Sequence, residues 1–413
     1  MLALVAGTLP GPDESLLSDA ERVAFDGQMR LLREIRPRPL GADVVLVGID
    51  EGTEAAFTEP IALWHRHFAE ALHALATASP RAVGVDIALP ERSFDAIVPG
   101  LDLAMMRALF DLRRTTHLVF VQNLNSKREV VPVQPNYGRI MQPENLGLDQ
   151  QERDPDGGSR RFAKYRDQKG RPVPTLASQV LSGLELPVDE GYIDYSLGAP
   201  LDYIPMHRVR EMDAVQLRQA FGGRVVLVGS LIGTTDRWRL PVKLLARDPG
   251  RGADAGKLLY EQPGVLIHLQ VLRTLLHTGM LHPVPELLRW LLCAVAALAV
   301  FVHARPAFVI AGAMLVPAAL LSASLAAVLS LQLLLPVASI VFCFWAALVV
   351  RGVFDAIEAP VDRLRLQQTF AGQVSPAVMK EMLGGSLTAG VSGQLADICV
   401  LFSDVRDFTT LSE

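Results

Sequence analysis

Carboxylate side chains follow several short apolar runs, and they are the clearest candidates in the sequence for binding a ligand. Asp50 and Asp86 close two such runs, and Asp236 lies in the loop after a third. Ligands of open α/β sheets favour the carboxyl ends of parallel strands, and carboxylates desolvated there attract polar or cationic molecules. The sequence therefore predicts a pocket lined by these three aspartates. The alternative is that they cap helices or pair with Arg81 and Arg237.

A further carboxylate, Asp404, follows an apolar run at residues 398–402. This run predicts a buried strand whose end would place the carboxylate where it can bind a hard divalent cation. The next residues predict a helix start, where the backbone amides of Phe408 and Thr409 would face negative charge. The alternative is a plain strand, turn and helix N-terminus without chemistry.

Two other polar patterns lack the spacing of a binding site. Residues 154–157, Asp-Pro-Asp-Gly, resemble the start of a calcium loop but lack the later ligands of an EF-hand, so we interpret them as a hairpin turn. The loop after Gly229 follows a predicted strand but lacks the Gly-Lys-Ser/Thr ending of a P-loop. A tight turn is the simpler interpretation of that loop.

The elements that must position these residues predict an α/β fold for residues 11–284. Residues 13–36 carry apolar side chains at helical spacing and end at two prolines. Residues 43–50, 81–87 and 224–230 are continuous apolar runs, typical of strands buried on both faces. A helical pattern between the first two runs predicts that they form a parallel βαβ unit.

The composition indicates a chain that lies partly in lipid. Of the 413 residues, 50% are hydrophobic, which is high for a soluble domain. The net charge of −5 is spread without a basic cluster, which argues against nucleic acid as a partner. All three cysteines lie after residue 290, so the N-terminal region is not a disulfide scaffold.

Three apolar segments predict transmembrane helices within residues 285–351. They cover approximately residues 287–302, 307–331 and 333–350. The second is long enough to span about 30 Å of hydrocarbon, and the other two are near the lower limit of about 17 residues. The alternative is three buried core helices.

The charges of the connecting loops predict the orientation in the membrane. Arg305 lies between the first two segments and Arg351 follows the third, whereas the loop at residues 330–332 carries no charge. Lys and Arg near helix ends stay in the cytoplasm, so residues before the first segment are expected outside and those after the third inside. Because an exported domain needs a signal or anchor, we interpret residues 1–10 as the tail of an N-terminal membrane helix. The alternative is a short strand or helix packed on the domain.

Six motifs between residues 43 and 276 resemble, in chain order, the second class of CHASE sensor domain. The resemblance implies a domain outside the membrane, followed by membrane helices, that controls a cytoplasmic kinase or cyclase. It implies an extracellular ligand of unknown identity. The motifs are DVVLVGID, RAVGVDIALPE, NLGLDQQERDPDGGSRRF, GYIDYSLG, GGRVVLVGSLIGTTDRWRLPV and QPGVLIHLQVLRTLL.

Two later segments resemble the start of the catalytic region in bacterial class III nucleotide cyclases. Residues 369–383 are similar to the segment that precedes the catalytic domain, and residues 397–413, DICVLFSDVRDFTTLSE, are similar to its first strand and the turn into its first helix. The resemblance implies a ferredoxin-like α/β domain. It also implies a homodimer, because the active sites of this family form between two catalytic domains.

The cyclase resemblance assigns roles to four residues. It implies that Asp404 and the Val405 carbonyl bind Mg²⁺ or Mn²⁺, and that Phe408 and Thr409 hold the triphosphate of ATP or GTP. Asp407 departs from the glycine that is common at its position. The second metal-binding aspartate and the transition-state residues of the family lie beyond this segment, so the 413-residue chain alone is expected not to catalyse.

These observations predict a membrane-bound sensor that couples an extracellular signal to the synthesis of a cyclic nucleotide, with cAMP favoured. The alternative is a non-catalytic, truncated receptor that binds ligand or pairs with an intact cyclase. A sensor kinase is disfavoured, because no kinase histidine box or glycine-rich nucleotide loop is present.

The chain is expected in the bacterial inner membrane, with a periplasmic sensor and a cytoplasmic C-terminus. Its parts are residues 1–10 (anchor remnant), 11–284 (sensor), 285–351 (membrane helices), 352–392 (signalling linker) and 393–413 (start of the cyclase domain).

Overall fold

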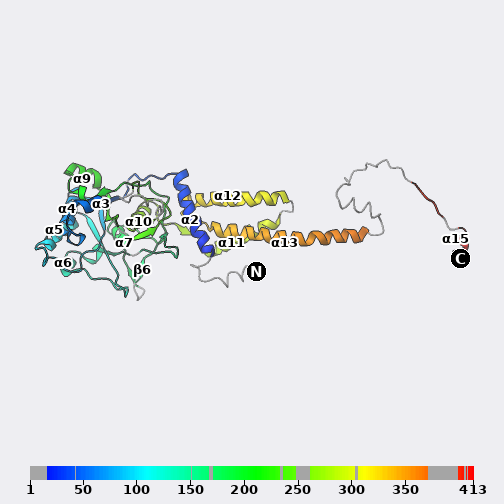
Figure 1. The fold of residues 1–413 in the computed structure, drawn as a ribbon, viewed down its shortest axis with the longest axis horizontal. Helices are drawn as coiled ribbons and strands as arrows, with labels where there is room; N and C mark the ends of the chain where they lie inside the picture. The colour runs from blue at the N-terminus through cyan, green and yellow to red at the C-terminus, as the bar shows by residue number, and fades with distance from the viewer. Residues whose placement is uncertain are drawn as a thin grey trace. The chain divides into compact units, whose positions relative to one another are not determined.

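The computed structural model describes residues 16–41, 43–149, 151–166, 171–232, 236–247, 261–302, 306–370, 399–403, 406 and 408–413. The chain divides into two compact units, Met1–Ala347 and Leu348–Glu413. The first contains a parallel sheet with helices on both faces, followed by apolar helices (Figure 1).

A six-stranded sheet forms the centre of the N-terminal α/β domain, with the strand order β4-β3-β2-β10-β1-β9 and parallel pairing throughout. Its longer strands are almost entirely buried, because helices cover both faces. The strands are β1 (Val45–Ile49), β2 (Ala82–Asp86), β3 (His117–Gln122), β4 (Leu146–Leu148), β9 (Ile204–Pro205) and β10 (Val225–Ser230).

Two apolar cores lie on opposite faces of this sheet, each closed by helices (Figure 1). On one face lie α4 (His65–Ala78), α5 (Leu101–Thr115) and α9 (Ala214–Phe221). On the other lie α2 (Leu16–Ile35), α7 (Leu176–Ser182) and α10 (Val265–His277). Residues 265–274 of α10 are all buried, so the polar side chains of this helix need partners inside the domain.

Short elements connect these layers. The helices among them are α3 (Glu51–Ala56), η1 (Ile61–Leu63), α6 (Pro135–Gly138), η2 (Pro143–Asn145) and α8 (Met206–Val209). The strands are β5 (Arg161–Phe162), β6 (Tyr165–Arg166), β7 (Pro172–Val173), β8 (Gly191–Tyr192), β11 (Arg237–Arg239), β12 (Glu261–Pro263), β13 (His282–Pro283) and β14 (Leu333–Leu334).

Within the sheet domain the predicted secondary structure agrees with the fold, with two differences. The amphipathic helix predicted over residues 13–36 is α2, and the strands predicted at residues 43–50 and 81–87 are parallel, as expected. The first difference is that β10 inserts between β1 and β2. The second is that the turn at residues 154–157 does not close a hairpin. The strand after it, β5, pairs with β8 instead, and the aspartates of the turn bind Arg160.

Apolar helices follow the domain: α11 (Glu286–Val302), α12 (Pro306–Leu331) and α13 (Val337–Phe370). Two stretches, Gly312–Leu331 and Val337–Glu358, are long and apolar enough to cross a membrane. Only 22% and 17% of these stretches are buried, which argues against the alternative of buried core helices.

In the unit Leu348–Glu413, the described residues form the rest of α13 and the short helix α15 (Phe408–Ser412). The strand predicted at residues 398–402 is not formed, since its described residues lack regular structure. Leu401 and Phe402 are 89% and 91% exposed. A strand needs neighbours to pair its backbone and cover its side chains, and none pairs with these residues in the described part of the chain.

Candidate functional site

A histidine and two carboxylates meet at the carboxyl end of the sheet, on the face that α10 covers. Asp86 ends β2, Asp149 follows β4, and His268 lies near the start of α10. The Nε2 atom of His268 is 3.1 Å from Oδ1 of Asp149 and 3.6 Å from Oδ1 of Asp86. One ligand atom of each residue lies within 4.8 Å of the other two. This arrangement is hereafter the carboxylate–histidine cluster.

The carboxylate–histidine cluster is buried on one side and open on the other. The side chains of His268 and Asp86 are 2% and 10% exposed, whereas that of Asp149 is 44% exposed. Burial raises the pKa of Asp86 to about 7, although His268 opposes the shift. Burial also opposes a charged His268, but the neighbouring carboxylates outweigh it and raise the pKa of the imidazole. The hydrogen bond from His268 lowers the pKa of Asp149 despite its desolvation.

Glycine allows α10 to approach the strands closely at this point. A Cβ on Gly229 would lie 2.9 Å from Cβ of Val265 and 3.3 Å from Cβ of Asp86. A Cβ on Gly264, just before α10, would lie 2.8 Å from Oδ1 of Asp236. Asp236 is therefore held at the N-terminal end of α10, where it contributes to the raised pKa of Asp86.

The third predicted residue, Asp50, serves a different purpose. Its Oδ1 atom accepts hydrogen bonds from the Thr53 backbone N–H at 2.8 Å and the Thr53 hydroxyl at 2.7 Å, and thus caps α3. Its Oδ2 atom accepts the Tyr203 hydroxyl at 3.0 Å. Because β10 separates β1 from β2, Asp50 does not join Asp86, and the alternative of a helix cap describes it.

Asp50→Ala is expected to lower the free energy of unfolding by about 1–3 kcal/mol, because it removes the cap of α3 and the acceptor of the Tyr203 hydroxyl. Asp50→Asn is the matched control. Asparagine is as good a helix cap as aspartate, so the free energy of unfolding should fall clearly less in this variant than in Asp50→Ala. Thermal unfolding of the purified chain measures both, and equal losses would contradict the capping role.

Asp149, Gln151 and His268 were not predicted from the sequence. The amide nitrogen of Gln151 lies 2.8 Å from Nδ1 and 3.0 Å from Nε2 of His268, so it completes one wall of the carboxylate–histidine cluster. The sequence did contain a signal for His268, because an otherwise apolar helix, α10, carries several polar residues that are buried: His268, Gln270, Arg273 and Thr274.

An apolar cavity of about 330 Å³ lies on the opposite face of the sheet, between α4, α5 and the end of β2. His65 is its polar member, and burial lowers the pKa of that imidazole. The other lining residues are Ile61, Ala62, Phe68, Ile87, Ala88, Leu89, Pro90, Phe94, Met105 and Phe120.

A second polar arrangement, the domain–helix junction, joins the domain to the apolar helices. β13 pairs with β14, so the segment before α11 is bonded to the connection between α12 and α13. The hydroxyl of Ser324 in α12 donates to Gln28 of α2 at 3.1 Å. The backbone N–H and hydroxyl of Ser339 in α13 both donate to Oε1 of Glu21 in α2, each at 2.7 Å.

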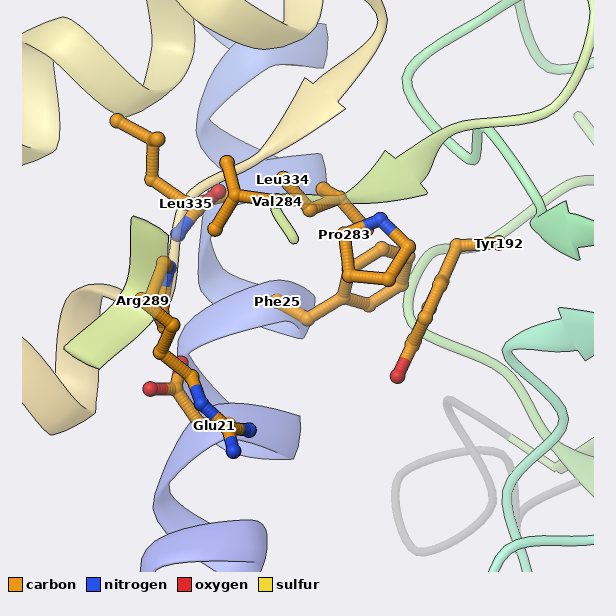
Figure 2. A pocket seen from close by; sticks show the side chains of 10 residues that line it. Glu21, Phe25, Tyr192, Pro283, Val284, Arg289, Leu334 and Leu335 are labelled. Carbon is orange, nitrogen blue, oxygen red and sulfur yellow. The ribbon is translucent and has the colours of Figure 1, made fainter. Parts of the chain in front are cut away.

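Figure 2 shows the cavity beside this junction, about 160 Å³ in volume, with residues from α2, β8, β13, β14 and α11 around it. Phe25 of α2 points toward Pro283, and Tyr192 lies beside both. The rings of Phe25 and Tyr192 are 5.6 Å apart between centroids. The junction thus combines apolar packing with carboxylate capping at the first turn of α13.

The site residues of the cyclase resemblance lie in the second unit. Phe408 and Thr409 are the first residues of α15, as predicted. Asp404 and Val405 lie outside the described residues.

The two helices that are apolar enough to cross a membrane indicate that this parallel α/β domain belongs to a membrane-associated protein. A family model described as CHASE2 domain matches residues 1–302, so the chain belongs to the CHASE2 family. CHASE2 is a family of extracellular sensor domains, which confirms the sensor prediction. Comparisons with curated proteins and with solved structures gave no match.

Proposed function

We propose that this chain is the sensor and membrane portion of a class III nucleotide cyclase, which couples an extracellular signal to the formation of a cyclic nucleotide from ATP or GTP. The CHASE2 match supports the sensor half of this proposal. The cyclase half is supported by the resemblance of residues 397–413 and by a helix that begins at Phe408, where that resemblance expects it.

The observation that carries the proposal is the contact between Glu21 and Ser339. Glu21 belongs to a helix of the sensor domain, and Ser339 lies in the first turn of α13. α13 contains the second candidate membrane span and continues to Phe370, and the segment that resembles a cyclase follows it in the sequence. A displacement of α2 would therefore act directly on a helix that leads to the catalytic segment.

The proposed membrane topology has three spans, with the sensor outside the cell and the C-terminus in the cytoplasm. α11 is the third span beside the two longer ones. It has 17 residues, near the minimum of about 17 for a membrane helix, and Leu287, Leu298 and Val302 are 82%, 66% and 75% exposed. The pairing of β13 with β14 keeps the start of α11 beside the connection from α12 to α13, as three alternating crossings require.

The proposed catalytic assembly is a homodimer in which Asp404 and Val405 bind Mg²⁺ or Mn²⁺ and α15 faces the triphosphate. Bound metal would stabilise negative charge on the phosphates. The chain would contribute the carboxylate of Asp404 and, four residues later in the sequence, the backbone N–H groups of Phe408 and Thr409 at the start of α15.

Alkaline phosphatase fusions test the topology. A fusion after Gly279, before α11, is expected to be active, because this enzyme folds only outside the cytoplasm. A fusion after Glu358, where the second candidate span ends, is expected to be inactive, and a cytoplasmic reporter at the same position provides the matched control. The reverse pattern would refute the proposed orientation and, with it, signalling from an extracellular sensor to a cytoplasmic cyclase.

A further inference from the structure

We propose that Asp86, Asp149 and His268 bind one divalent transition-metal ion in the sensor domain. The donor set is one imidazole nitrogen and two carboxylate oxygens. Imidazole favours Zn²⁺ and related ions, whereas Mg²⁺ and Ca²⁺ prefer oxygen ligands alone. The inference concerns the sensor domain itself, so it holds whether or not a cyclase is the output.

The distances already approach those of a metal site. Ligand bonds of about 2.0–2.2 Å place two tetrahedral ligands of Zn²⁺ about 3.4 Å apart. The Nε2 atom of His268 is 3.1 Å from the nearest oxygen of Asp149 and 3.6 Å from that of Asp86. The oxygens of the two carboxylates lie within 4.8 Å of each other, and Asp149, whose side chain is 44% exposed, has room to adjust around an ion.

Three separate elements supply the ligands. Asp86 closes a central strand, Asp149 follows an outer strand, and His268 belongs to a helix packed on the sheet. Ligands held by regular elements are more precisely placed than ligands on one loop. The exposed side chain of Asp149 gives an ion a path from solvent.

The surroundings of Asp86 point independently to a cation. Its side chain is 10% exposed, yet no hydrogen-bond donor reaches its carboxylate among the described residues. Its nearest cationic atom is Nε2 of His268, which donates instead to the more exposed Asp149. In the described part of the chain this mostly buried carboxylate therefore has no donor, which is costly, and a metal ion between Asp86 and His268 would reduce that cost.

The test uses the full chain, purified in detergent and stripped of metal with a chelator that is then removed. The wild-type protein is expected to bind one Zn²⁺ per chain and to melt at a higher temperature with Zn²⁺ than without. Asp86→Asn and His268→Gln are each expected to weaken Zn²⁺ binding at least about 100-fold. Removing a residue that only hydrogen-bonds to a metal ligand already lowers metal affinity by up to about 100-fold, so removing a ligand itself should cost no less. Calorimetric titration and metal analysis after dialysis measure affinity and stoichiometry.

Two controls separate metal binding from folding and from the catalytic segment. Asp86→Asn replaces a mostly buried carboxylate whose desolvation outweighs its attraction to His268, so without metal it should melt no lower than the wild type. His282→Gln alters an exposed histidine–carboxylate pair with Asp189 and should keep the Zn²⁺ response, as should Asp404→Ala. Absence of binding by the wild type, or full binding by Asp86→Asn and His268→Gln, would overturn the proposal. Equally tight binding of Mg²⁺ would overturn the assignment to a transition metal.

Discussion

Arg160→Met is expected to lower the free energy of unfolding of the sensor domain by about 3–5 kcal/mol, because it leaves buried carboxylates without their cation. Arg160 is 2% exposed, and all five of its N–H groups are used. Nε and Nη2 bind Asp26 of α2, both terminal nitrogens bind Asp156, and Nη1 also binds Asp154, at 2.7–2.9 Å. Gly158 makes room, since a Cβ there would lie 2.6 Å from Nη1 of Arg160.

Arg247→Met is the matched control for this prediction. Arg247 forms an ion pair with Asp202, but their side chains are 81% and 60% exposed, so its loss should cost about 0–1 kcal/mol. Thermal unfolding of the purified chain in detergent compares the two variants. Similar melting temperatures for Arg160→Met and the wild type would show that the buried ion cluster does not stabilise the domain.

The pH dependence of unfolding gives the same prediction a second readout. The hydrogen bonds from Arg160 lower the pKa of Asp156 from 3.8 to about 2. A carboxylate whose pKa is lower in the folded state stabilises it above pH 3.8, and this contribution is lost as the pH falls toward 2. In the Arg160→Met variant the free energy of unfolding should therefore fall less between pH 3.8 and about pH 2 than it does in the wild type. An unchanged pH profile would contradict the assigned role of Arg160.

The positions of the main elements could be predicted because their apolar patterns are strong. The helix over residues 13–36 and the runs at 43–50, 81–87 and 224–230 became α2, β1, β2 and β10. The order of the strands could not be predicted, because it depends on which strand pairs with which across the chain. Because β10 lies between β1 and β2, Asp50 and Asp86 have different neighbours.

The candidate site could be predicted only in part for the same reason. Strand ends identified Asp86 and the loop that holds Asp236, but His268 comes from a helix far along the chain. Asp149 and Gln151 follow a three-residue strand with little pattern of its own. A cluster formed by three distant segments is a property of the packing, and the spacing of residues in the sequence does not contain it.

The same dependence on neighbouring elements explains why the described residues of the apolar run before Asp404 do not form a strand. Its pattern is that of a strand, yet Val400, Leu401 and Phe402 are 60%, 89% and 91% exposed. The start of α15 was predictable, because the backbone hydrogen bonds of a helix lie within the helix, whereas those of a strand need a partner strand. We therefore expect this run to form a strand when the rest of a catalytic sheet is present.

Asp404→Ala is accordingly expected to abolish nucleotide cyclisation in a protein that carries a complete class III catalytic domain continuing from residues 399–413. A cation that bridges protein and phosphates needs oxygen ligands in near-octahedral geometry, and alanine supplies none. Cyclic nucleotide formed from ATP or GTP with Mg²⁺ or Mn²⁺ by purified membranes measures the effect.

Asp407→Gly is the matched control, because it removes a nearby carboxylate but restores the residue common in the family, so activity should persist or rise. Full activity of Asp404→Ala would refute the assignment of this segment to a cyclase, and loss of activity in both variants would refute a specific role for Asp404.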